Sequence, residues 1–348
     1  MLNINEIARL YNTSAISDVK EIDSSRGDLD KRYTFLLTFN DGQQLAIKAC
    51  RNSFTGREKI AGWKKLCKAY LDLGIYCPQI ITSVQGNESE IIIAEDQEYH
   101  VYAEEIKKYK AYNELDSKPD FKNLKGSIVE SVGKIAADCD VILPWPSVYC
   151  VYDTFCAEDK VDENYENAEA FCNKIKNQFK EYSEYADAIW ELFLIKRNAF
   201  EPVYRKLPKA SFQSDLNSTN ILVDENQNFT GLIDFNLSGS IAVLCYIILC
   251  EVCGYCLKTS NLEHLTQNDF LEKCDDYLYK NIKLMNKHYE FSDYEKEHFC
   301  LCYNTVYPFS YWMINGMLDY AIRENKTQYI KEIMDWVYYQ LSRDDIKI

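Results

Sequence analysis

The sequence predicts an α+β fold of two lobes, an antiparallel β-sheet lobe followed by a mainly helical one. The first lobe carries short apolar runs separated by polar turns, which is typical of strands. The second carries apolar side chains at helical spacing, most clearly at 122–138, 167–185 and 186–197. The chain has 348 residues, of which 47% are hydrophobic, and no linker rich in Gly, Pro and Ser. It can therefore bury a large core, divided into lobes at 1–106 and 107–348.

Pairs of apolar runs around turns predict the strands of the first lobe. Residues 32–39 and 43–50 flank a turn at 40–42 that contains Asp-Gly, which indicates a β-hairpin. Residues 90–94 and 99–106 flank a second polar turn in the same way. These four runs predict the antiparallel sheet of the lobe.

One helix is predicted between the two strand pairs. Residues 55–71 have helical spacing, and Thr55 with Glu58 three residues later has the spacing of a capping box. The chain then passes Gly74 and Pro78 into another short apolar run. The first lobe is therefore expected to hold one helix beside its sheet.

Two polar motifs of the second lobe carry the candidate chemistry. Asp215 and Asn220 are five residues apart, and a predicted hairpin over 220–235 returns Asp234 to Asn220. Phosphoryl transfer needs a carboxylate at the acceptor hydroxyl and oxygen ligands for Mg²⁺ close by. Asp215 suits the first role, and Asn220 with Asp234 suits the second. Either motif alone is more often the end of a hairpin, but their order favours a site.

The two motifs resemble those of the aminoglycoside phosphotransferase and choline kinase superfamily, the small-molecule relatives of protein kinases. The catalytic loop of that family reads His-Gly-Asp-x-x-x-x-Asn, and its metal strand reads Ile-Asp-Phe-Gly or similar. The resemblance implies a protein kinase-like bilobal fold, a catalytic role for Asp215 and Mg²⁺ roles for the Asn and the second Asp. Gln213 and Ser214 stand where the family has His-Gly, and Asn236 where it has Gly. The family His is mostly an internal support and Asn tolerates positive φ, so no reacting group is lost.

The first lobe supplies residues expected of a nucleotide-binding site. Lys48 ends the run Ala-Ile-Lys on a predicted strand, the pattern by which kinases aim an ammonium at the α- and β-phosphates of the nucleotide. Such a lysine needs a carboxylate to hold it, and the resemblance gives this role to Glu58. A Glu three residues after an N-cap Thr can also serve only to close the capping box, so both roles of Glu58 stay open.

Two backbone segments complete the predicted nucleotide site. By the resemblance, the nucleotide base forms hydrogen bonds with backbone groups from Glu104 to Ile106 at the end of the last strand. Because side-chain identity there says little about the choice of base, ATP and GTP both stay open as donors. The loop at 23–28 precedes the first clear strand, where a phosphate-covering loop belongs, and amides around Ser25 are expected to face phosphates. With its single glycine, this loop is equally typical of a surface turn.

Charge and cysteine content limit the partners. A formal net charge of −15 and a pI near 4.9 argue against nucleic acid, because its binding depends on Lys and Arg. An acidic protein attracts cations, which favours a cationic small substrate, although an ordinary soluble surface has the same charge. Fourteen cysteines without a signal peptide indicate unpaired thiols in a reducing, cytoplasmic compartment. The apolar run at 241–250 is too short to span a membrane.

Aromatic residues concentrate between Tyr303 and Trp312. Aromatic faces can hold ammonium groups. At this helical spacing, however, they are more often part of the core.

These observations predict an ATP- or GTP-dependent O-phosphotransferase that acts on a small hydroxyl compound. By the resemblance, the first acceptor to consider is an aminoglycoside-type antibiotic, with a role in antibiotic resistance, and the second is a choline-like or sugar metabolite. A nucleotide-binding pseudokinase with a regulatory role is the alternative from another class, motivated by Gln213, Ser214, Asn236 and the glycine-poor loop. A protein kinase is disfavoured because no Ala-Pro-Glu segment follows Asp234.

Overall fold

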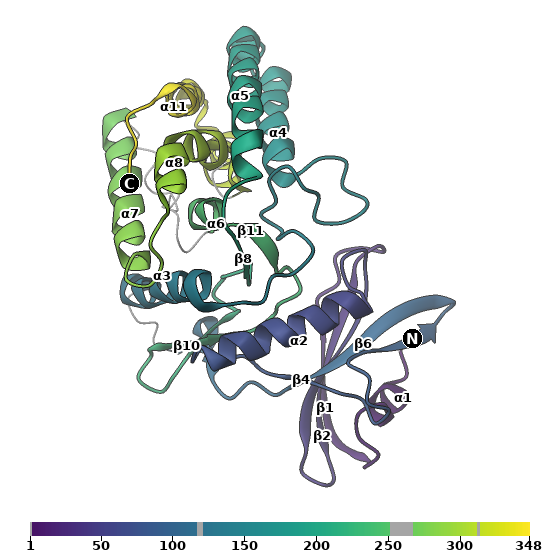
Figure 1. Ribbon diagram of the computed structural model, residues 1–348. Helices are drawn as coiled ribbons and strands as arrows, with labels where there is room; N and C mark the ends of the chain where they lie inside the picture. The colour runs from purple at the N-terminus through teal and green to yellow at the C-terminus, as the bar shows by residue number, and fades with distance from the viewer. Residues whose placement is uncertain (1, 117–120, 251–266, 312–313) are drawn as a thin grey trace. The chain divides into compact units, whose positions relative to one another are not determined.

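The computed structural model describes residues 2–116, 121–250, 267–311 and 314–348, which form two compact units (Figure 1). The first unit contains the chain up to residue 118 together with 156–158 and 218–238. The second contains 119–155, 159–217 and 239–348. The division into lobes at residue 106 stays a prediction. The first unit extends past that residue and takes in the segment that carries Asn220 and Asp234.

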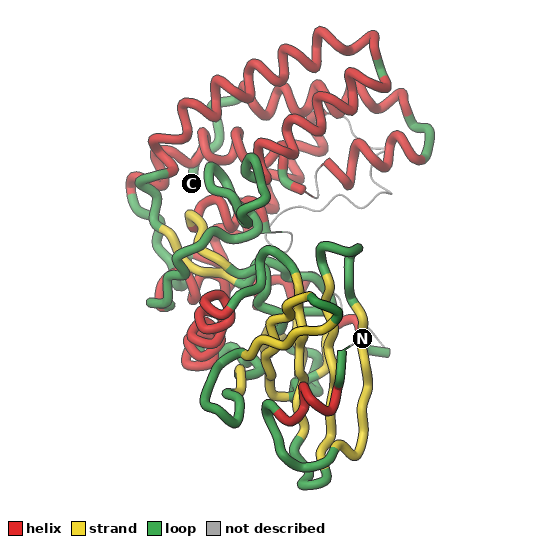
Figure 2. The backbone as a smooth tube through the Cα atoms, turned by 90° about the vertical axis from the view of Figure 1, so that its right-hand side faces the viewer, coloured by secondary structure: helices red, strands yellow, loops and turns green. Residues whose placement is uncertain are grey.

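A six-stranded antiparallel sheet forms the centre of the first unit (Figure 2). Its strands pair in the order β1-β2-β3-β6-β4, and β5 also pairs with β6. Helix α1 (Ile4–Arg9) packs on the sheet, where Ile7, Phe35 and Ile47 are almost fully buried. The strands are β1 (Ile16–Asp23), β2 (Lys31–Phe39), β3 (Gln44–Arg51), β4 (Ile80–Ile81), β5 (Glu90–Ala94) and β6 (Gln97–Glu105).

The four strands predicted in two pairs are confirmed, with shifts of one or two residues at some ends. The β5–β6 turn consists of Glu95 and Asp96, both with positive φ, as a two-residue hairpin turn requires. Neither α1 nor β1 was predicted. Nearly every side chain of β1 is exposed, so its sequence carries no alternation of apolar and polar residues.

Helix α2 (Arg57–Asp72) confirms the predicted helix but not its predicted start. Gly56 is the N-cap, and no side chain makes a capping hydrogen bond there. The predicted capping box of Thr55 and Glu58 is therefore wrong: Thr55 is buried and Glu58 is exposed in the first turn. The helix is held instead by its apolar face, where Trp63 and Tyr70 are buried.

A smaller sheet in the first unit carries the predicted hairpin. It consists of β7 (Lys110–Ala111), β9 (Ile221–Val223) and β10 (Phe229–Leu232) in the order β10-β9-β7, and η1 (Tyr112–Glu114) follows β7. Tyr76 joins β10 from outside through hydrogen bonds from its N–H to the Thr230 carbonyl and from the Leu232 N–H to its own carbonyl. A Cβ on Gly231 would lie 2.0 Å from the Tyr76 carbonyl oxygen, so this close approach requires glycine.

The second unit is mainly helical, and α4 and α5 run side by side in it (Figure 1). A two-stranded antiparallel ribbon pairs β8 (Lys209–Phe212) with β11 (Gly239–Ala242). The α-helices are α3 (Phe121–Asp138), α4 (Glu163–Gln178), α5 (Ser183–Tyr204), α6 (Val243–Leu249), α7 (Gln267–Met285), α8 (Asp293–Val306), α10 (Asp319–Arg323) and α11 (Ile330–Ser342). Tighter or wider turns are η2 (Lys180–Tyr182), η4 (Tyr307–Phe309), η5 (Ile314–Leu318) and η6 (Thr327–Tyr329).

The predicted helices are confirmed except for one break. The sequence predicts helices at 167–185 and 186–197, whereas the chain leaves the helical conformation at Phe179, with φ −132° and ψ 70°. Apolar spacing continues across this break because α4 and α5 pack against each other, so periodicity alone does not locate it. Arg197 of α5 pairs with Asp162, which caps α4 by accepting from the Tyr165 N–H.

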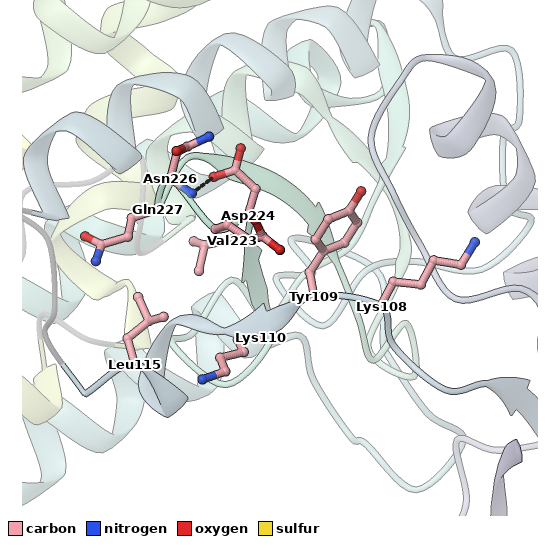
Figure 3. Close-up of a pocket in the computed structure, with 9 residues that line it drawn as sticks. Lys108, Tyr109, Lys110, Leu115, Val223, Asp224, Asn226 and Gln227 are labelled. Carbon is pink, nitrogen blue, oxygen red and sulfur yellow. Dashed lines mark hydrogen bonds between the residues drawn. The ribbon is translucent and has the colours of Figure 1, made fainter.

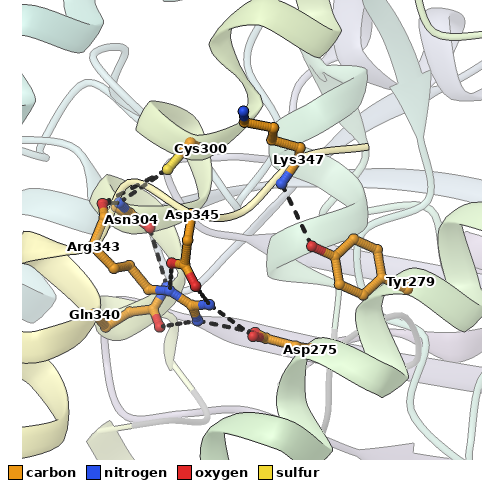
Figure 4. Close-up of polar contacts among 8 residues, drawn as sticks. All are labelled: Asp275, Tyr279, Cys300, Asn304, Gln340, Arg343, Asp345 and Lys347. Atoms are coloured by element: carbon orange, nitrogen blue, oxygen red, sulfur yellow. Dashed lines mark hydrogen bonds and ion pairs between the residues drawn. The ribbon is translucent and has the colours of Figure 1, made fainter.

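Figure 4 shows how the C-terminal segment is fixed to the helices before it. The buried guanidinium of Arg343 pairs with Asp275 of α7 at 2.8 Å and with Asp345 at 2.7 Å. The Arg343 carbonyl accepts from the Asn304 amide of α8. The charge-assisted bond to Asp275 holds the end of α11 against α7, and the neutral bond from Asn304 holds it against α8.

Three further expectations concern side-chain environment. Tyr303, Tyr307 and Phe309 are buried, which confirms the core interpretation for these aromatics, while Tyr311 is exposed and Trp312 lies outside the described residues. None of the cysteines in the described residues forms a disulfide, and most are buried. None of the helices in the described ranges has the length and apolar character needed to cross a bilayer.

Candidate functional site

Lys48 lies near the middle of the first-unit sheet, on β3 between β2 and β6. Its ammonium is 3.1 Å from Glu104 Oε2 and 3.6 Å from Asp234 Oδ1. The side chains of Lys48 and Glu104 are only 16% and 14% exposed. Three charged groups from β3, β6 and the segment after β10 therefore meet at one place in the first unit.

The electrostatics of this cluster favour a charged lysine. Burial by itself lowers the pKa of Lys48, but Glu104 and Asp234 outweigh it and hold the pKa of the ammonium well above its usual value. The ammonium also lies 5.6 Å from the centroid of the Tyr102 ring. Lys48 thus presents a fixed positive charge.

The carboxylate that pairs with Lys48 differs from the one predicted. Glu58 is exposed at the start of α2, and Glu104 of β6 contacts Lys48 instead. Tyr102 is opposite Lys48 in the β3–β6 register, so Glu104, two residues further on the same face, is a diagonal neighbour. The pairing of Lys48 with Glu58 is therefore corrected. The sequence predicted the strand but not its register, and only the register identifies this neighbour.

The β9–β10 hairpin brings Asn220 and Asp234 together as predicted. The Ile233 N–H donates to the Asn220 carbonyl at 3.0 Å, one residue before Asp234. Asn220 is buried, and its Oδ1 accepts from the Thr219 hydroxyl at 3.2 Å. Two oxygen-bearing side chains, fourteen residues apart in the sequence, are thus positioned at the same end of one hairpin.

The backbone at Asp234 has an unusual conformation. Its φ is +62°, in the left-handed region that few residues other than Gly and Asn adopt. Asn236, which stands where the resembling family has Gly, is not among the described residues with positive φ. Left-handed non-glycine residues concentrate at functional sites, where surrounding structure holds them.

Asp215 lies in the second unit, three residues after β8. The segment before it is well anchored. Gln213 and Ser214 are each 1% exposed, the Gln213 carbonyl accepts from the Tyr246 hydroxyl at 2.7 Å, and the Ser147 hydroxyl donates to Ser214 Oγ at 2.7 Å. The loop that carries Asp215 therefore starts from a rigid, buried base.

The predicted phosphate-covering loop is bonded to itself. The Ser25 N–H donates to Asp23, the Ser25 hydroxyl accepts from the Arg32 N–H, and the Arg26 N–H donates to the Asp30 carbonyl. These bonds occupy the amides that were expected to face phosphates. A role for Ser25 in phosphate binding stays a prediction.

The predicted base-binding edge is the end of β6. The Glu105 N–H donates to the Gln79 carbonyl at 3.0 Å, which leaves β6 paired up to its last residue. Ile106 comes immediately after it, outside the strand. Hydrogen bonding of the nucleotide base by the backbone of Glu104 and Ile106 also stays a prediction.

A cavity of about 450 Å³ in the second unit combines acidic and aromatic side chains. Asp159, Glu163 and Glu166 line it together with Phe155 and Tyr311, and so does Lys174, whose ammonium pairs with Asp319. Burial, aided by the neighbouring Glu166, raises the pKa of Glu163 to about 8. Glu163 therefore adds a negative charge to the cavity only above about pH 8, where a cation would gain from it.

The same cavity adjoins the segment that supports Asp215. Val148 and Cys150 line the cavity. Tyr149 lies between these two residues, and its N–H donates to the Ser147 hydroxyl. The Ser147 hydroxyl in turn donates to Ser214 Oγ, and Ser214 directly precedes Asp215. One short segment therefore contributes both to the cavity wall and to the support of the loop.

Another cavity, of about 660 Å³, lies in the first unit between residues 108–110 and the turn of the β9–β10 hairpin (Figure 3). The Asp224 carboxylate accepts from the Asn226 and Asn228 N–H groups, so it closes the turn. The described residues that line this cavity include none of the predicted site residues. The position of this cavity therefore does not support a role in the predicted phosphoryl transfer.

The fold agrees with that of solved small-molecule kinases. An amicoumacin kinase in complex with AMP-PNP, Ca²⁺ and Ami is 14% identical, with a TM-score of 0.51 over 95% of this chain and 92% of that one. A microcompartment-associated aminopropanol kinase is 11% identical, with a TM-score of 0.52 over 97% of each chain. No protein-family model and no curated protein matches the chain. The predicted fold class is confirmed: the chain has the α+β, protein kinase-like fold of these small-molecule phosphotransferases.

Proposed function

We propose that the protein is an ATP- or GTP-dependent O-phosphotransferase that acts on a small hydroxyl compound. The observation that carries this proposal is the cluster of Lys48, Glu104 and Asp234 beside Asn220 in the first unit. A fixed ammonium and two oxygen ligands are the groups needed to hold a nucleotide triphosphate with its metal. The solved amicoumacin kinase, which shares the fold, was bound to AMP-PNP, and this supports an adenine nucleotide as donor.

Each group of the cluster has a distinct proposed role. Lys48 contacts the α- and β-phosphates of the nucleotide, and Glu104 takes the part of orienting Lys48 that the sequence assigned to Glu58. Asn220 and Asp234 offer an amide and a carboxylate oxygen, which fit Mg²⁺ because this ion prefers hard oxygen ligands and keeps several waters. When bound, Mg²⁺ would supply neutralisation of the phosphate charge.

Asp215 is the proposed group at the acceptor. It orients the acceptor hydroxyl and takes its proton while the hydroxyl oxygen forms a bond to the γ-phosphorus and the bond to the nucleoside diphosphate breaks. Strong basicity is unnecessary because the transition state is loose, so position matters more than pKa. The buried base of its loop supports this positioning.

The proposed acceptor carries an amino group beside its hydroxyl. The acidic and aromatic cavity, which shares the segment 147–150 with the support of Asp215, would favour an ammonium. The aminopropanol kinase of the same fold is named for an amino alcohol. Aminoglycoside-type antibiotics are the first acceptors to consider, which would make this a resistance enzyme, and choline-like or sugar metabolites are the second. Buried free thiols support a cytoplasmic location.

A nucleotide-binding pseudokinase is the second candidate. The loop around Ser25 favours it, because internal hydrogen bonds occupy amides that would otherwise cover phosphates. A protein of this kind would bind the nucleotide without transferring phosphate.

Replacing Asp215 separates the two candidates. Asp215→Asn is expected to lower Mg²⁺-dependent phosphate transfer by about 10²- to 10⁴-fold, the usual contribution of a positioned proton acceptor. Nucleotide binding, measured by calorimetry, is expected to change less than about twofold because the phosphate-binding groups are untouched. Unchanged turnover would contradict the role of Asp215, and nucleotide binding without transfer by the wild type would favour the pseudokinase.

Glu104→Gln and Glu58→Gln form a matched pair that tests which carboxylate holds Lys48. The first is expected to lower kcat/KM for the nucleotide by about tenfold, because a charge-assisted hydrogen bond contributes about 1.5 kcal/mol or more. The second is expected to stay within about twofold of the wild type because Glu58 is exposed. The opposite ranking in steady-state kinetics would return the role to Glu58.

Glu163→Gln tests the proposed cationic acceptor. At about pH 9, where Glu163 is ionised, KM for choline, whose own charge does not titrate, is expected to rise about tenfold in the variant, while KM for the nucleotide is unchanged. Deprotonated Glu163 attracts the cation, so wild-type KM for choline is expected to fall as pH rises through about 8, and the variant is expected to lose this dependence. The control is Glu169→Gln on the exposed face of the same helix. Equal KM values for both variants would remove the cavity from the acceptor site.

A further inference from the structure

The amide side chain of Gln213 brackets the backbone of Asp215. Gln213 Oε1 accepts from the Asp215 N–H at 2.9 Å, and Gln213 Nε2 donates to the Asp215 carbonyl at 3.1 Å. An amide group has one acceptor and one donor end, so a single side chain satisfies both polar groups of the Asp215 backbone. These two bonds restrict rotation of the backbone on both sides of the Asp215 Cα.

Asn217 holds the same residue from the other side. Its Nδ2 donates to Asp215 Oδ1 at 2.7 Å, which restricts rotation of the carboxylate itself. The residues two positions before and two positions after Asp215 therefore fix its backbone and its side chain respectively. Both are neutral amides, which keep their hydrogen-bonding pattern over the working pH range.

Gln213 is itself held from several directions. The Tyr246 hydroxyl donates to its carbonyl, and the Tyr246 ring stacks on Phe212 with centroids 3.8 Å apart and an interplanar angle of 11°. The Ser214 hydroxyl also donates to the Phe212 carbonyl at 3.1 Å. The backbone of Gln213 is therefore fixed and the residue is buried, which a positioning group requires.

We propose that Gln213 and Asn217 form an amide clamp that positions Asp215 for proton transfer. Both act through Asp215, so they are positioning residues rather than catalytic ones. The proposal rests on the proposed function, in which Asp215 takes the proton of the acceptor hydroxyl. Misplacement of a reacting group by about 1 Å can lower the rate about 100-fold. Loss of either restraint on Asp215 is therefore expected to lower the rate substantially.

The clamp explains how this loop works without the histidine and glycine of the resembling family. Gln213 reaches Asp215 over two residues, and both bonds are local. A purely structural role of these bonds would lower nucleotide binding together with turnover. The clamp predicts that kcat falls while nucleotide binding is unchanged.

ATP hydrolysis tests the clamp without knowledge of the acceptor, because water takes the place of the hydroxyl compound. Gln213→Met and Asn217→Leu keep the side-chain size and remove the amide. Each is expected to lower kcat for Mg²⁺-ATP hydrolysis by about 10- to 100-fold, with KM for ATP within about twofold, when assayed well below the melting temperature, which falls modestly because hydrogen bonds to Asp215 are lost. Gln213→His and Asn217→His, which restore an N–H donor, are expected to recover part of kcat. Gln178→Met, an exposed change of the same type on α4, is the control.

A second background separates the clamp from the proposed function. In Asp215→Asn, adding Gln213→Met is expected to lower the residual rate by less than about twofold, because residues that act as a unit are not additive. Full additivity, or a kcat loss that is matched by an equal loss of nucleotide affinity, overturns the clamp. If Asp215→Asn lowers hydrolysis but neither amide variant does, the clamp fails alone. If the wild type releases no phosphate, or Asp215→Asn has no effect, the proposed function fails.

Discussion

A buried ammonium must be paired, and the pairing of Lys48 organises the first unit around it. Isolated charges are expensive to bury, so the side chain is stable at 16% exposure only because two carboxylates reach it. Glu104 comes from the neighbouring strand, and Asp234 comes from the end of the β9–β10 hairpin, far along the chain. One electrostatic requirement thus brings the central sheet and the hairpin together. The same arrangement leaves a fixed positive charge beside an oxygen-rich hairpin end.

The position of Glu104 on a strand determines how far the Lys48–Glu104 distance can vary. A carboxylate on β6 belongs to the same sheet as Lys48, so their distance depends on strand register. A carboxylate on α2 would make it depend on the position of that helix. Sheet register is fixed by many hydrogen bonds and changes less readily than helix position. The first unit is therefore expected to keep Lys48 oriented whether or not nucleotide is bound. Asp234, held in a left-handed conformation, is the strained member of the cluster.

The sequence predicted features that depend on local pattern. The β5 bounds, Lys48 on a strand and the return of Asp234 to Asn220 result from alternation and turn chemistry, and the structure agrees with them. The sequence did not predict β1, because the side chains of this strand are exposed on both faces. It did not predict the break at Phe179, because apolar residues keep their helical spacing from α4 into α5. The Glu104 contact depends on strand register and the Gln213 contacts depend on rotamers. Neither is visible in a one-dimensional pattern.

The central claim is transfer of phosphate to a small hydroxyl compound, and ³¹P NMR tests it most directly. The protein would be incubated with Mg²⁺ and ATP or GTP and, in separate samples, kanamycin, aminopropanol, choline and a sugar. We expect a new phosphomonoester signal that grows with the nucleoside diphosphate in at least one amino-alcohol sample and disappears when EDTA removes the metal. Tight nucleotide binding with no phosphomonoester and no diphosphate in any sample would contradict the claim.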